Sequence, residues 1–334
     1  MTARGAARTA AMGTFFEVVV AHEDQRRAAL LAEHACSIAL DLHALWSPFE
    51  RSSAIARLSR DAAAGWTVVD PRTFALLSLC RDVWEASGGR FDITVGPLMR
   101  AWGMRGGPAR PDAPAGITRG MRHVELDAAS RAVRFAREEI ELDLGAIGKG
   151  AALDAMATEL LSLGVECAFM HAGTSSALAI GAPPETGGWR VRISSLPDAP
   201  VVTLRDTALG VSAPSLSPCL HGERRPPQSD GDGCCATNLP SSEKSCSSED
   251  SSIHILDPRT GRPVDTDLAC TAVLCESAAA ADAWSTALLA GAPIYTVAPR
   301  AAWLARRTNV DTVTWQSSVG GKLGVDDDRV LERA

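Results

Sequence analysis

The chain has 334 residues, of which 46% are hydrophobic and 22% charged, a composition typical of a globular protein with a full core. Its formal net charge of −7 excludes the sequence-wide basic field that nucleic-acid-binding proteins use. We therefore expect no nucleic-acid partner. We also expect any anionic ligand to be held by locally gathered positive charge or by a bound cation.

The first 20 residues contain arginines but no sustained apolar core and no clear cleavage site, so they do not predict a secretory signal. No later stretch approaches an uninterrupted membrane span. The nine cysteines are an odd number in scattered positions, which indicates a reducing compartment. The sequence therefore predicts a cytoplasmic protein with no membrane span.

Strand and helix patterns alternate in the first half of the chain. Residues 13–22 are rich in β-branched and aromatic side chains, which predicts a strand. Apolar residues at helical spacing predict helices over 28–47 and from Thr73 to a stop at Gly88 and Gly89, with a short apolar pattern at 54–60 between them. Three short strands are then expected, at 123–127, 132–136 and 140–145.

The second half continues the alternation. Helices are predicted over 152–164 and 278–291, the latter with Ser277 as its N-cap. Strands are expected at 165–173, 177–181 and 270–277, together with an antiparallel pair at 189–194 and 200–205. This order predicts an α+β fold with mixed or antiparallel sheets flanked by helices, rather than a doubly wound parallel sheet.

Residues 214–252 differ in kind from the rest of the chain. They are almost all Ser, Pro, Gly, Asp and Cys, with hardly any large apolar side chain. Such a segment cannot bury enough surface to offset its conformational entropy, so we expect a disordered insertion. The insertion lies within one domain that extends over residues 12–334.

The segment LDLGAIGKGAALD, residues 142–154, is the first candidate site. It places Gly145, Gly148 and Gly150 around Lys149, one of only three lysines in the chain, ahead of a helical pattern. Glycines let backbone approach a ligand, and a helix N-terminus attracts phosphate. The spacing fits neither a P-loop nor a dinucleotide fingerprint, so a plain strand-to-helix turn and a phosphate cradle both remain open.

Three further groups are candidates. Asp282 and Thr286 lie four residues apart, on one helical face, and could give two oxygens to a hard cation such as Mg²⁺; a solvated Asp with a back-bonded Thr is the alternative. His254, just before the turn of DPRTG, could be a general base or a structural histidine. The segment FDITVGP carries Asp92 and Thr94 at an otherwise ordinary strand end.

Taken together, seven segments resemble the ApbE family of FAD:protein FMN transferases. In chain order they are MGTFFEV, SAIARLS, GGRFDITVGPLMRAWGM, LDLGAIGKGAALD, HAGTSSALAIG, HILDPRTGRPV and ADAWSTALL. The resemblance runs from Met12 to about Gly291, apart from the insertion. It implies an α+β fold of two lobes with a flavin cleft between them.

The resemblance also implies an activity. The expected enzyme is Mg²⁺-dependent, cleaves the FAD pyrophosphate, transfers FMN to a Thr or Ser hydroxyl of an acceptor flavoprotein and releases AMP. Two alternatives stay open, namely an FAD pyrophosphatase that gives FMN and AMP, and a catalytically weak flavin-binding protein.

Matched positions imply the residue roles. Asp282, Thr286 and the backbone carbonyl of Ala146 would bind the metal, and His254 would deprotonate the acceptor hydroxyl. Lys149 would face the pyrophosphate as a catalytic and binding residue. The segments expected to line the FAD site contribute Met12, Gly13, Thr14, Asp92, Thr94, Gly96, Gly145, Gly148 and Gly150.

The chain departs from the family pattern at three places. His171-Ala-Gly-Thr174-Ser175 replaces N-A-G-G-[DN], which changes the polar group that this segment offers. Ile93 replaces a proline, and Ala54 replaces an acidic residue. The first change puts the flavin or metal contacts of that segment in doubt.

Overall fold

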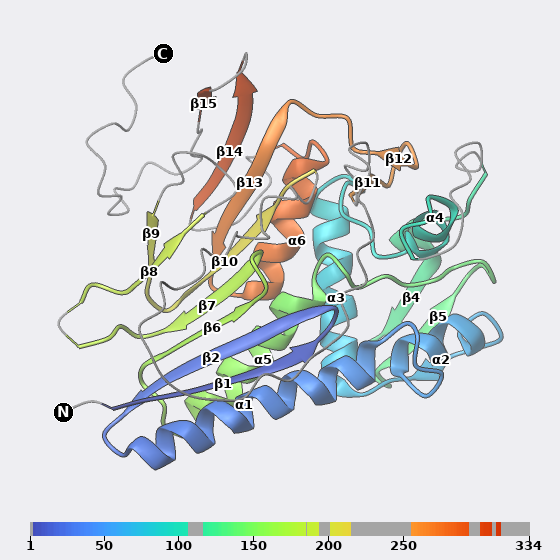
Figure 1. The fold of residues 1–334 in the computed structure, drawn as a ribbon. Coiled ribbons are helices and arrows are strands. Elements are labelled where there is room, and N and C mark those ends of the chain that lie inside the picture. The colour runs from blue at the N-terminus through green and yellow to red at the C-terminus, as the bar shows by residue number, and fades with distance from the viewer. Residues whose placement is uncertain are drawn as a thin grey trace, which may run out of the picture.

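A computed structural model describes residues 3–105, 116–184, 186–193, 201–214, 255–293, 301–308 and 312–314, and it confirms the α+β fold class. An antiparallel sheet of eight strands dominates one lobe (Figure 1). Its strands, in spatial order, are β1 (Ala3–Ala11), β2 (Thr14–His22), β6 (Ala168–Ala172), β7 (Ser176–Ile180), β10 (Thr207–Ser212), β13 (Leu268–Cys275), β14 (Ala301–Thr308) and β15 (Thr312–Thr314).

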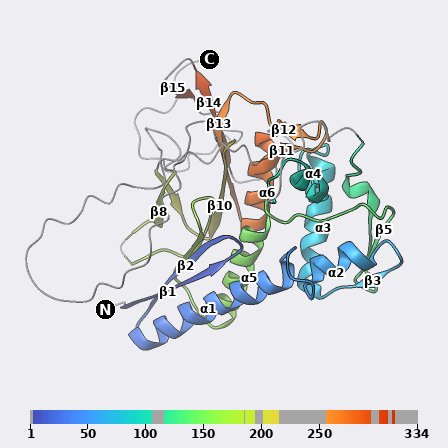
Figure 2. The same ribbon diagram turned by 45° about the vertical axis from the view of Figure 1, so that its right-hand side comes forward.

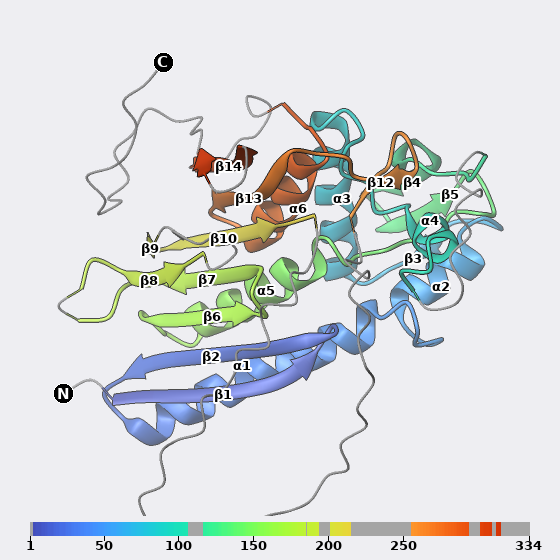
Figure 3. The same ribbon diagram turned by 45° about the horizontal axis from the view of Figure 1, so that its top comes forward.

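The two faces of this sheet are covered differently. Helices α1 (Gln25–Trp46), α5 (Gly148–Ser162) and α6 (Ala278–Leu289) lie behind it, as Figure 3 shows. Their apolar side chains and the inner sheet face form the main core. A hairpin of β8 (Trp189–Arg192) and β9 (Val201–Leu204) forms a smaller apolar cluster with strands of the sheet, including β7, β10 and β13.

A second lobe stands beside the helical layer (Figure 2). Its helix α3 packs against α6, and the main core continues into it. Its elements are α2 (Ala54–Asp61), α3 (Pro71–Ala86), α4 (Gly96–Ala101), the short 3₁₀ helix η1 (Met121–His123), the sheet of β3 (Thr67–Val68), β5 (Ala132–Phe135) and β4 (Val124–Asp127), and the hairpin of β11 (Leu256–Asp257) and β12 (Arg262–Pro263).

Strand β2 forms as the sequence predicts, with Phe16, Val18 and Val20 fully buried at alternate positions. Its partner β1 was not predicted, because its alanines and arginines carry little strand propensity. The two strands pair in register around a tight turn at Met12 and Gly13, which both have positive φ. Strand β1 therefore depends on its partner rather than on its own sequence.

The predicted helices start at recognisable caps. The side chains of Asp24, Asp70 and Ser277 accept hydrogen bonds from backbone N–H groups in the first turns of α1, α3 and α6. Pro71 occupies the first turn of α3, where a missing N–H has no cost. These local signals explain why α1, α3 and α6 could be found from the sequence, whereas α5 has no side-chain cap at its start.

Two predictions at the glycine segment were wrong. Residues 140–145 form no strand; they are held by isolated backbone bonds, such as Asp143 N to Ile93 O at 2.6 Å. Helix α5 begins at Gly148, four residues earlier than predicted, so Lys149 and Gly150 belong to its first turn. Apart from Pro214, the predicted insertion lies outside the described residues.

Helix α1 meets the length and apolarity of a membrane span by composition, contrary to the sequence-based expectation that no stretch would. Its buried residues, among them Leu31, Ala35 and Leu42, pack into the main core with β1, β2 and α5. This packing accounts for its apolar composition in a helix that covers a sheet.

Asp154 on α5 fixes the start of α6. Its carboxylate accepts from Ala278 N at 2.7 Å, Ala279 N at 2.9 Å and Ser277 Oγ at 2.7 Å. The substitution Asp154→Ala leaves these buried donors without their acceptor, so we expect a loss of about 2 kcal/mol in the free energy of unfolding, measured in urea. The matched change at the exposed Asp41 on α1 serves as the control; equal losses in the two variants would contradict the capping role.

Candidate functional site

The first turn of α5 meets the middle of α6 and the start of β7 at one carboxylate. Gly150 N donates to Asp282 Oδ2 at 2.8 Å, and Ser176 Oγ donates to the same oxygen at 2.9 Å. Asp282 is 5% exposed. The fold therefore joins the glycine segment to Asp282, although the two are 132 residues apart in sequence.

The environment of Asp282 disfavours its charge. Burial raises the pKa of the Asp282 carboxyl to about 7, against the opposing effects of the nearby Lys149 charge and the bonds from Ser176 and Gly150. Both hydrogen-bond donors are neutral groups. A bound cation would favour the ionised carboxylate here.

Lys149 reaches the same place through two hydroxyls. Its Nζ donates to Ser175 Oγ, and Ser175 Oγ lies 3.4 Å from Ser176 Oγ, the group that contacts Asp282. Ser175 and Ser176 were not predicted as site residues. The only signal in the sequence was the departure of HAGTSS from the family pattern.

Thr286 follows Asp282 by one turn of α6 and is half-buried. Its Oγ1 lies 3.1 Å from Ser212 Oγ at the end of β10, and Ser212 Oγ also lies 2.8 Å from Ser285 Oγ. Thr286 therefore meets the hydroxyl group of Ser212 from the neighbouring strand. No sequence signal marks Ser212.

The three glycines of the segment have different surroundings. Gly145 N donates to Asp143 Oδ1 at 2.7 Å, Gly148 N donates to Leu144 O at 2.7 Å, and Gly150 N is bound by Asp282. A Cβ on Gly150 would lie 2.2 Å from Ala278 O. Gly150 thus permits the close approach of α5 to α6, and all three N–H groups already have protein partners.

A hard divalent cation fits the chemistry of this group. Among the described residues, no three His, Cys, Asp or Glu side chains gather into a metal cluster, so Asp282 would be the one acidic ligand. Thr286 adds a neutral oxygen, and the half-buried Ala146 lies in the turn that leads into α5. Neutral and carbonyl oxygens with one carboxylate suit Mg²⁺, which keeps waters and substrate phosphates as its other ligands.

The β1–β2 turn lies against this site. Met12 N donates to His43 Nδ1 at 3.2 Å, and Met12 Sδ lies 3.8 Å from the position of a Cβ on Gly148. Thr14 Oγ1 contacts Gly173, in the turn between β6 and β7. Met12 is therefore adjacent to the glycine segment and Thr14 to HAGTSS, with Gly13 between them in the turn.

Asp92, Thr94 and Gly96 hold the backbone of the second lobe. Asp92 Oδ1 accepts from Thr94 N at 2.8 Å and from Thr94 Oγ1 at 2.6 Å, and Thr94 Oγ1 accepts from Gly120 N at 2.6 Å. Gly96 N donates to Glu141 O, and a Cβ on Gly96 would lie 2.8 Å from that oxygen. Their described contacts connect three loops of this lobe.

His254 lies outside the described residues, but the hairpin that follows it is firmly held. Trp102 Nε1 donates to Gly261 O at 2.9 Å, and Arg119 donates to the carbonyls of Pro258 and Arg259. The hairpin therefore belongs to the second lobe, although the following strand β13 belongs to the large sheet.

The sequence matches the family model described as the ApbE family over residues 12–215 and 242–302. The chain belongs to the ApbE family. This membership accounts for the concurrence of LDLGAIGKG and ADAWST at one buried carboxylate.

Individual ApbE relatives agree. A protein of Rhodobacter capsulatus named FAD:protein FMN transferase is 30% identical over 269 residues, which are 78% of this chain and 45% of that protein. One of Salmonella typhimurium with the same name is 26% identical over 83% of this chain and 76% of its own length.

Solved ApbE structures share the fold. The flavin transferase ApbE of Vibrio cholerae superposes with a TM-score of 0.73 at 21% identity, over 95% of this chain and 98% of that one. The apo flavinyl transferase ApbE of Pseudomonas stutzeri also gives 0.73, at 22% identity, over 95% and 94%.

The segment that departs from the family pattern is well anchored. His171 Nε2 lies 2.9 Å from Glu17 Oε2, and His171 Nδ1 lies 3.0 Å from Gly173 O. These contacts fix the turn that presents Ser175 to Lys149. The changed segment thus offers a hydroxyl at this place in the ApbE site.

The buried carboxyl predicts a pH dependence of stability. Because burial raises the folded-state pKa of Asp282 to about 7, its contribution favours folding when the group is protonated and is lost as pH rises from about 4 through 7. In EDTA, we expect the wild type to lose on the order of 2 kcal/mol more between pH 5 and 7 than Asp282→Asn, which cannot ionise. Urea unfolding at both pH values measures this. Parallel losses in the two proteins would contradict the shift.

Proposed function

We propose that this ApbE chain is an enzyme that transfers FMN from FAD to a Thr or Ser hydroxyl of an acceptor flavoprotein, with Mg²⁺ and with release of AMP. The relatives named FAD:protein FMN transferase support the reaction. The observation that carries the proposal for this chain is the contact of Gly150 and Ser176 with the buried Asp282, which places the first turn of α5, with Lys149, beside a candidate metal ligand.

The bond changes follow from the two substrates. The acceptor oxygen forms a bond to the FMN phosphorus, and the bond between that phosphorus and the bridging oxygen of the pyrophosphate breaks. AMP leaves with the bridging oxygen, and the proton of the acceptor hydroxyl needs a base. Such a transfer depends on charge neutralisation and in-line positioning.

The residues of the chain divide these tasks. Lys149, half-buried beside Ser175, gives a positive charge for the pyrophosphate. Asp282, Thr286 and the carbonyl of Ala146 would hold Mg²⁺, which supplies charge neutralisation when bound. His254 accepts the proton of the acceptor hydroxyl.

The remaining segments bind and orient FAD. Met12, Gly13 and Thr14 border the glycine segment and the HAGTSS turn, and their position supports a role in binding the flavin. Asp92, Thr94 and Gly96 shape the adjoining loops of the second lobe.

The proposed location is the cytoplasm. The free thiols of five described cysteines support it, namely Cys36, Cys80, Cys167, Cys270 and Cys275.

An assay with FAD, Mg²⁺ and a flavoprotein acceptor separates this function from its two rivals. Fluorescent flavin on the acceptor in a denaturing gel, with AMP in the supernatant, is the result we expect. AMP and free FMN alone would indicate an FAD pyrophosphatase, and intact bound FAD would indicate a flavin-binding protein. EDTA should abolish the turnover, and Mg²⁺ should restore it.

The proposed base predicts a selective loss. His254→Ala should reduce flavin transfer by about 100-fold or more, because no base then takes the proton from the hydroxyl of the acceptor flavoprotein. The affinity for FAD should stay near that of the wild type. Gel fluorescence and quenching of flavin emission measure the two quantities. His34→Ala, at the exposed face of α1, is the control. Normal transfer by His254→Ala would remove the histidine from this role.

A further inference from the structure

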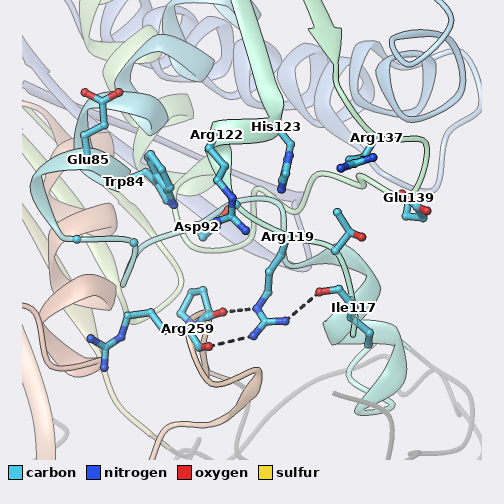
Figure 4. A pocket seen from close by; sticks show the side chains of 15 residues that line it. Trp84, Glu85, Asp92, Ile117, Arg119, Arg122, His123, Arg137, Glu139 and Arg259 are labelled. Atoms are coloured by element: carbon cyan, nitrogen blue, oxygen red, sulfur yellow. Dashed lines mark hydrogen bonds between the residues drawn. The ribbon is translucent and has the colours of Figure 1, made fainter. Parts of the chain in front are cut away.

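A cavity of about 770 Å³ opens in the second lobe, outside the contacts that surround Asp282. It lies between the end of α3, the segment around η1 and the hairpin that follows His254 (Figure 4). Its titratable lining has four arginines, Arg119, Arg122, Arg137 and Arg259, and His123, against three carboxylates. In a chain with a net charge of −7, this is a local gathering of positive charge.

Two of these guanidinium groups are available to a ligand. Arg119 is used by backbone carbonyls of the hairpin, whereas Arg122 and Arg137 are exposed and donate no hydrogen bond to any residue that the structure describes. The charge of Arg122 acts on the nearby Asp92 carboxyl, whose pKa it lowers against the larger effect of burial. Figure 4 shows Arg122 and His123 reaching into the cavity from the same segment. Burial and the charges of Arg122 and Arg137 lower the pKa of His123, as expected in a positive potential.

Three carboxylates also line this cavity, and their negative charge restricts which anionic ligands can bind in it. Asp92 is buried, its carboxylate accepts hydrogen bonds from Thr94, and burial raises its pKa. Glu85 and Glu139 border the basic groups, with Glu85 pointing away from them in Figure 4. A compact polyanion such as a diphosphate would meet these carboxylates. A peptide with spaced acidic side chains can contact the arginines and keep its own carboxylates away from those of the cavity.

The position of the cavity favours the second substrate. Pro258 and Arg259 line it, and they follow the proposed base His254 by only four and five residues. None of its lining residues is among those that contact Lys149 or Asp282. The residues proposed to face the FAD phosphates are therefore not those of the cavity, although Asp92, expected to line the flavin cleft, lies in the wall of both.

We propose that the cavity receives carboxylate side chains from the segment of the acceptor protein that carries the Thr or Ser hydroxyl. This inference rests on the proposed function. Arg122 and Arg137 are the contact residues, and Arg119 holds the hairpin that forms one wall.

Fluorescence anisotropy with a defined probe tests the binding. The probe is a fluorescein-labelled 12-residue peptide of Gly and Ser with one central Thr and three Asp, and its matched version carries Asn for Asp. We expect the Asp peptide to bind more tightly, and the double variant Arg122→Gln/Arg137→Gln to weaken it about fivefold. The control Arg26→Gln/Arg27→Gln removes two exposed arginines at the start of α1 and should leave binding unchanged.

Flavin fluorescence quenching of FAD completes the test. We expect the affinity for FAD to be the same in the double variant and the wild type. No preference of the wild type for the Asp peptide, unchanged peptide binding by the double variant, or a comparable loss of FAD affinity in it would overturn the proposal. Because these measurements need no turnover, absence of flavin transfer with intact Asp-dependent binding would contradict the proposed function alone.

Discussion

The close approach of α6 to its neighbours is the constraint on which the site depends. Gly150 of α5 and Gly210 of β10 both face α6, and a Cβ on either would lie within 2.5 Å of α6 backbone atoms, those of Ala278 and Ala281. Only glycine allows backbones to approach so closely. As a result Asp282, on the helix between them, loses contact with water and must find its partners in protein or in a bound cation.

The burial of Asp282 links packing to chemistry. The Asp282 carboxylate is held by a backbone N–H and a serine hydroxyl, which are neutral donors. It therefore lacks a full countercharge, and this favours a cation bound beside it. The same contacts order the first turn of α5, which carries Lys149. An acidic chain thus places one positive charge, Lys149, beside the buried carboxylate and groups four arginines around the cavity of the second lobe.

Local patterns sufficed for much of the fold and for little of the site. Helices α1, α3 and α6 have apolar repeats and caps such as Ser277, α5 has no side-chain cap, and β2 alternates clearly. Strand β1 was missed because pairing decides its structure. Residues 140–145 have a strand-like sequence but pair with no strand in the described part of the chain. The contacts of Ser175 and Ser176 follow from packing over long sequence separations, which periodicity does not encode. Motif resemblance supplied Asp282 and Lys149, without their partners.

The anchoring of the β11–β12 hairpin by Trp102 and Arg119 bears on how this family tolerates chain-length variation. The hairpin begins at Leu256, two residues after His254 in the sequence, so the described chain is fixed a short distance downstream of the proposed base. Residues 214–252 precede the hairpin in the sequence, so extra residues in that segment lengthen the chain upstream of the contacts that hold the hairpin. The contacts that hold the hairpin come from Trp102 and Arg119, so a change in the length of the preceding polar tract leaves those contacts in place.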